Sequence, residues 1–148
     1  MDQRPDQGSA VKVGMVWGTL GGVIGFLVAL IGGALAGILF SIFVGFSCGR
    51  RAAAAEAGKR SGASSGLIGG ALATPIFVLG ASAGSVVSAR SVSTAEMANM
   101  ISDMSGIEVS SQGAWQLFLL SLVFAAFIQA LILILVATAA GAWTMRKK

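Results

Sequence analysis

Three long apolar stretches divide the chain, and short polar segments separate them. They cover residues 13–48, 62–87 and 114–144. A helix needs about 20 consecutive apolar residues to cross the hydrocarbon core of a bilayer, so the second and third stretches each predict one transmembrane helix, over 62–88 and 114–144. The pattern predicts an all-α integral membrane protein with three transmembrane helices.

The first stretch is too long for one upright span and barely long enough for two. No polar turn interrupts it, and Gly32-Gly33 is only a weak break. We favour one long helix over 13–57, tilted or kinked, which continues past the membrane through an alanine-rich cytoplasmic extension. A helical hairpin is the alternative. The stretch far exceeds the apolar core of a secretory signal, so we expect it to be retained.

The segment between the second and third stretches predicts a short amphipathic surface helix over 93–105. Ser93 and Glu96 have the spacing of a capping box, and Gly106 is a natural stop. The apolar residues that follow recur at helical spacing: Met97, Met100, Ile101 and Met104. Polar tails over 1–12 and 145–148 complete the predicted organisation.

Charge placement predicts the orientation. Basic residues lie between the first two stretches and end the chain: Arg50, Arg51, Lys59, Arg60, Arg146, Lys147 and Lys148. The loop over 88–113 instead carries Arg90 beside three carboxylates. Since positive residues remain on the cytoplasmic side, we expect a multi-pass protein of the cell (cytoplasmic) membrane with its N-terminus outside and its C-terminus cytoplasmic. The hairpin alternative would move the N-terminus inside.

Tryptophans mark the expected membrane borders. Trp115 and Trp143 bracket the third span, 28 residues apart. At about 1.5 Å per residue they lie about 42 Å apart, which matches a bilayer with its headgroups. Trp17 has the same predicted role on the first span.

Small residues follow one another at every fourth position of the first stretch, and they are the strongest pattern in the chain. The row comprises Gly21, Gly25, Ala29, Gly33, Gly37, Ser41, Gly45 and Gly49, and a second row of Gly14, Gly18 and Gly22 overlaps it. The second span repeats the spacing with Gly62, Gly66 and Gly70. Small side chains let membrane helices approach closely, so the rows predict glycine-zipper packing, either within one chain or between copies.

Two isolated residues interrupt the apolar spans near mid-membrane depth. Gln129 lies midway between Trp115 and Trp143, where a buried amide needs a partner; an interhelical hydrogen bond or a polar spot on a permeation path would supply one. Pro75 removes a helix hydrogen bond and predicts a kink in the second span.

Composition supports a membrane protein and argues against an enzymatic function. The 148 residues are 55% hydrophobic and 11% charged, with 21 glycines and a mean hydropathy of +0.86. The net charge of +4 sits at the ends of apolar runs, so we expect no nucleic-acid partner. The chain has one cysteine and no histidine, which removes the usual base and commonest metal ligand. We expect no catalytic, cofactor or metal site.

These observations favour a small structural or accessory membrane protein. Its expected partners are the lipid bilayer and either itself or the subunits of a larger membrane complex, held by the glycine rows. A homo-oligomeric channel or small-solute transporter, with Gln129 on its path, is the alternative from another functional class.

Overall fold

The computed structural model describes residues 9–57 and 61–146, and the described chain is helical. The helices are α1 (Ser9–Ala55), α2 (Gly62–Arg90), α3 (Thr94–Ser105) and α4 (Ser111–Arg146). Three of them, α1, α2 and α4, are long and apolar enough to cross a membrane, which makes this a multi-pass membrane protein. Most of the predicted N-terminal tail and half of the C-terminal tail lie outside the described residues.

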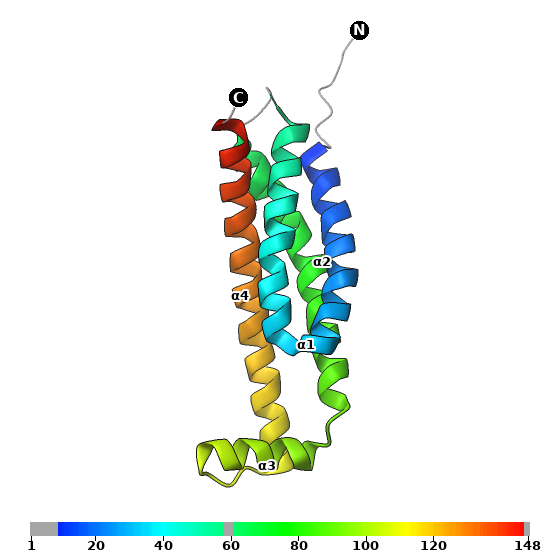
Figure 1. The fold of residues 1–148 in the computed structure, drawn as a ribbon, viewed down its shortest axis with the longest axis vertical. Coiled ribbons are helices and arrows are strands. Elements are labelled where there is room, and N and C mark those ends of the chain that lie inside the picture. The colour runs from blue at the N-terminus through cyan, green and yellow to red at the C-terminus, as the bar shows by residue number, and fades with distance from the viewer. Residues whose placement is uncertain (1–8, 58–60, 147–148) are drawn as a thin grey trace.

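The helix α1 is a hairpin rather than one rod (Figure 1). Its two arms, residues 9–32 and 34–55, meet at Gly33, whose backbone is non-helical with φ 66° and ψ −163°. The two arms are antiparallel, as two contacts between them show. The Ala10 amide donates to Glu56 Oε1 at 3.3 Å, and the Arg51 guanidinium lies over the Trp17 ring. The predicted single long helix is therefore wrong, and its hairpin alternative is the structure. One glycine makes the turn, so the sequence carries no polar turn.

This reversal also changes the topology. The start of α1, the start of α2 and the end of α4 lie together at one end of the bundle, here called the basic end (Figure 1). Lys12, Arg50 and Arg51 belong to it, and α3 lies at the opposite end with Glu96 and Asp103. The start of α1 and the end of α4 therefore lie at the same end of the bundle, which is the arrangement that the hairpin alternative implies.

The core lies between the two arms, α2 and α4. Its fully buried side chains include one large ring, Phe77 of α2, beside Val44 and Leu133. Phe77 occupies the space opposite two glycines of the first arm, since a Cβ on Gly25 would lie 3.0 Å from Phe77 Cε2. The partly buried rings of Trp17 and Phe40 pack against this core from outside.

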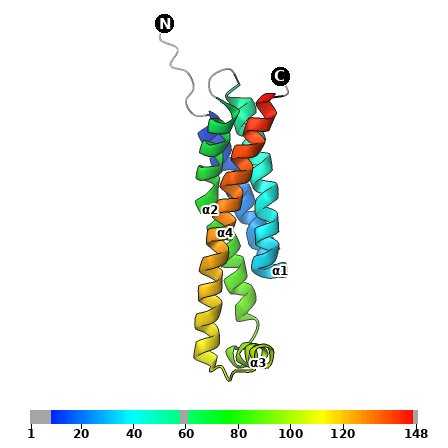
Figure 2. The ribbon, with the colours of Figure 1, turned by 90° about the vertical axis from the view of Figure 1, so that its left-hand side faces the viewer.

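The helix α3 crosses the bundle axis beyond the hairpin tip, and Figure 2 shows it nearly end-on. Ser93 Oγ accepts a hydrogen bond from the Glu96 amide at 3.1 Å, and Gly106 ends the helix with φ 70°. Ala98 is buried, whereas Met100 and Met104 are exposed. Part of the predicted apolar face is therefore left uncovered by the bundle. A surface helix buries such a face in a lipid leaflet.

Candidate functional site

The predicted row of small residues is divided by the turn at Gly33. On the first arm, Gly21 and Gly25 face inward: a Cβ on Gly21 would lie 2.9 Å from Val44 Cγ1. Ala29 is fully buried one turn further along. At Gly33 itself, an added Cβ would meet nothing within 4 Å. This half of the row lines the space between the arms and α2.

The remaining members of the row face α4. A Cβ added to Gly37 would lie 2.8 Å from Gln129 Nε2. A Cβ added to Gly45 would lie 2.8 Å from the Leu133 carbonyl oxygen. Ser41 is buried between them and donates to the Ile38 carbonyl at 2.6 Å. The second arm thus uses its small residues to approach α4.

The glycines of α2 meet the same stretch of α4. Gly66 and Gly49 both contact the backbone of Ala137, and Gly70 would place a Cβ 2.8 Å from the Ala137 Cβ. Gly62 contacts the backbone of Gly141. The backbone of α4 therefore inserts between the second arm and α2, which larger side chains would prevent.

The overlapping second row packs the first arm on α2. A Cβ would lie 2.7 Å from the Gly69 carbonyl oxygen at Gly14, and 2.8 Å from the Ile76 carbonyl oxygen at Gly22. Further down α2, Gly80 contacts Gly22 and Gly84 contacts Phe26, both through backbone atoms. Apart from Gly33, the members of both predicted rows thus lie at contacts within one chain.

Gln129 and Pro75 differ from each other in burial. The Gln129 side chain is 3% exposed, and its Oε1 has no hydrogen-bond partner among the described residues. An interhelical hydrogen bond to this oxygen is therefore missing from the part of the chain that the structure describes. Pro75 is exposed, and α2 continues through it as a helix. The predicted kink stays a prediction.

Glu56 is a buried carboxylate whose role the sequence interpretation missed. It is 4% exposed; its Oε1 accepts the bond from the Ala10 amide, and its Oε2 accepts one from Ser65 Oγ at 2.9 Å. It joins the first turn of α1, the end of α1 and the first turns of α2, where helix N-termini favour negative charge. In the sequence Glu56 follows four alanines. The one signal of its role is that it is the single carboxylate among the basic residues at positions 50, 51, 59 and 60.

Among the described residues, no group of three or more metal-binding side chains comes together. Comparison with protein-family models, curated proteins and solved structures finds no match for this chain. The geometry of the helices is therefore the basis on which a function is proposed.

Proposed function

We propose that this protein is a structural or accessory integral membrane protein whose hairpin tip docks on a neighbouring membrane-embedded chain. The observation that carries the proposal is the helix break at Gly33, which is flanked by the exposed side chains of Ile31 and Leu35. We assign the basic end to the cytoplasmic side, together with both the start of α1 and the end of α4, because positive residues remain there.

The depth of the tip follows from its contact with α4. Gly37 lies against Gln129, which is midway between the two interfacial tryptophans of α4. Gly33 is one turn beyond Gly37, so it lies about 6 Å past the bilayer midplane. The hydrocarbon core extends about 15 Å from the midplane. On this placement the tip ends inside the hydrocarbon, short of the far interface.

A break at this depth needs a covering other than lipid. Non-helical backbone occurs inside a membrane only where protein or a water-filled cavity covers it. Within this chain the tip is open: Ile31 is 89% exposed and Leu35 is 75% exposed. Since the glycine rows are already packed against helices of the same chain, the tip is the surface that best fits a partner.

The pore alternative receives less support. A pore through Gln129 would need its amide to face a polar path between chains. Instead the side chain is buried against Gly37 of the same chain, and Ala81 lies next to that contact. We therefore do not extend the proposal to transport.

Cross-linking at the tip tests the proposal. In a Cys48→Ala background, Leu35→Cys is placed at the tip and Leu135→Cys on the lipid-facing side of α4, where the leucine is 65% exposed. Native membranes are treated with a short thiol-reactive cross-linker and adduct masses are measured. We expect adducts from Leu35→Cys only, at dimer mass for self-assembly and at another mass for a different subunit. No adduct, or equal yields at both positions, would contradict the proposal.

A further inference from the structure

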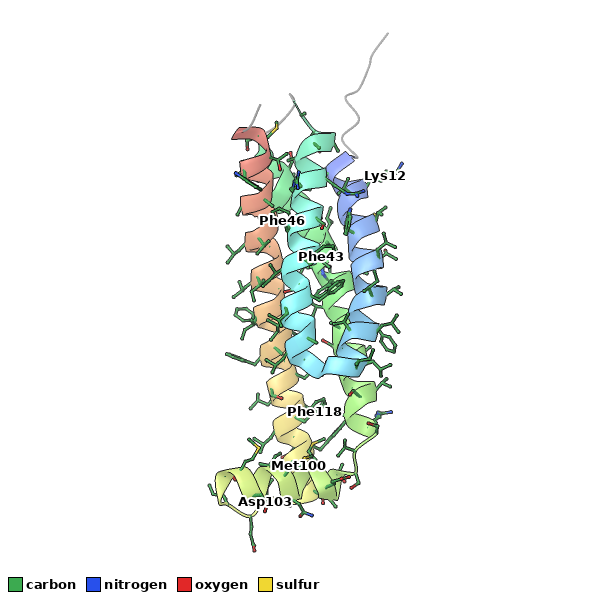
Figure 3. The ribbon with its side chains drawn as sticks, viewed as in Figure 1. Lys12, Phe43, Phe46, Met100, Asp103 and Phe118 are labelled. Carbon is green, nitrogen blue, oxygen red and sulfur yellow. The ribbon has the colours of Figure 1, made fainter. Side chains whose placement is uncertain are left out.

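A second surface, independent of the hairpin tip, carries the chemistry of an anion site. A cavity of about 470 Å³ opens at the basic end between the two arms and the end of α4. Its walls include Trp17, Phe43 and Phe46, and its cations are Arg50 and Arg51. Figure 3 shows Phe43 and Phe46 on the second arm, below this end of the bundle. The volume is in the range of small-ligand sites, about 300–1,000 Å³.

The aromatic rings hold both guanidinium groups. Arg50 Cζ lies 5.5 Å from the Phe46 ring centroid, and Arg51 Cζ lies 5.0 Å from the Trp17 ring centroid. A guanidinium over a ring face is attracted by the ring quadrupole. Its N–H donors lie in its own plane and stay available for the oxygens of a phosphate, which this planar group binds in a bidentate manner.

An apolar, aromatic surface lies next to Arg50 and Arg51. Phe43 stacks on Phe40 with ring centroids 5.8 Å apart, so aromatic rings continue along the second arm from the cavity toward the tip. Phe46 also packs beside Trp143 at 6.3 Å. Because Trp143 marks the predicted interface, this placement puts the arginines and Phe46 at headgroup level. Phe43 and Phe40 are then nearer the level of the acyl chains.

A second groove provides the contrast. A cavity of about 380 Å³ lies between the first arm and α2, lined by Val23, Leu27 and Ile76 among others, and no charged residue lines it. That groove fits hydrocarbon alone. Of these two cavities, the one at the basic end combines paired cations with an apolar wall.

We propose that the cavity walled by Trp17, Phe43 and Phe46 binds the phosphate of an anionic phospholipid through Arg50 and Arg51. The acyl chains would extend along the Phe43 side of the second arm. Anionic lipids are concentrated in the cytoplasmic leaflet, which attracts cations near its surface. The site therefore holds the hairpin at a fixed height in that leaflet.

Native mass spectrometry of the full chain, released from mild detergent, tests this site. The probes are phosphatidylglycerol, phosphatidylcholine and glycerol 3-phosphate, each at equal concentration. We expect one tightly bound phosphatidylglycerol per chain, weaker phosphatidylcholine binding and no displacement by glycerol 3-phosphate. Arg51→Gln should weaken phosphatidylglycerol binding about tenfold, as the loss of charge-assisted hydrogen bonds implies.

Lys12→Gln is the matched control, because it removes one charge at the same end from a residue outside the cavity lining. It should leave phosphatidylglycerol binding unchanged, and Arg51→Lys should give an intermediate affinity. Thermal unfolding in the same detergent checks that each variant is folded. Equal weakening by Lys12→Gln and Arg51→Gln would overturn the proposal in favour of diffuse charge. Equal binding of the two lipids, or displacement by glycerol 3-phosphate, would also overturn it.

Discussion

The two ends of the bundle are built differently. At the basic end, both arms of α1 pack with α2 and α4 through backbone contacts, as at Gly49 and Gly66 against Ala137. Beyond the hairpin tip only α2 and α4 continue, and α3 lies across them (Figure 1). There α4 carries large side chains, such as Trp115, which stacks on Phe118 of the same helix with ring centroids 5.3 Å apart. Close packing is therefore confined to the part of the bundle where the hairpin is present.

The comparison shows what the small residues accomplish. Membrane helices gain little from hydrophobic burial, so their stability depends on close van der Waals packing. Four helical segments can share one narrow bundle at the basic end only because glycine removes the side chains between them. At the α3 end, α2 and α4 are not packed around a hairpin and need no such approach.

The largest expected effect separates the two ends directly. Gly66→Leu places a branched side chain against the Ala137 backbone, which cannot rotate away, and should lower the free energy of unfolding by more than about 3 kcal/mol. Gly113→Leu, near the α3 end, meets only the Ser110 hydroxyl and the Val109 side chain and should change stability by less than about 1 kcal/mol. Denaturant unfolding in detergent measures both. Equal losses of unfolding free energy in the two variants would contradict the difference in packing between the basic end and the α3 end.

A second test compares two carboxylates. Glu56→Gln replaces one acceptor oxygen with an amide that cannot accept from both Ala10 and Ser65, so unfolding should become easier by about 2 kcal/mol. Glu96→Gln changes an exposed side chain at the α3 end and should cost less than about 0.5 kcal/mol. Thermal unfolding of the two variants and the wild type provides the comparison. A wild-type midpoint for Glu56→Gln would show that the buried carboxylate does not join α1 to α2.

A third test predicts a stability change of opposite sign for a hairpin and for a continuous helix. In the hairpin, Gly33 adopts a backbone conformation that is essentially restricted to glycine, so Gly33→Ala should destabilise the protein by about 1–2 kcal/mol. In a continuous helix the same change would stabilise it by about 1 kcal/mol. Gly106→Ala is the matched control at the α3 end, since Gly106 also has a positive φ and should cost about 1 kcal/mol. A stabilised Gly33→Ala variant would contradict the hairpin.

The sequence allowed the helical class, the apolar stretches and the caps of α3 to be predicted, because these features depend on local pattern. Ser93 and Gly106 are examples, since each acts within a few residues of its own position. The candidate packing residues could be named for the same reason: small residues at a spacing of four occupy neighbouring turns. The partner of each glycine could not be predicted, because spacing along one helix does not reveal which helix faces it.

Hydropathy and glycine spacing thus determined by themselves that the chain forms long apolar helices able to approach one another. Only the tertiary structure decided that α1 reverses at Gly33, that both ends of the described chain lie at the basic end, and that Glu56 joins two helices there. The physical reason is that a single glycine can make the turn without leaving a polar signal, so only the contacts between the arms distinguish a hairpin from a rod. Those same contacts bring Arg51 over Trp17, from positions far apart in the sequence.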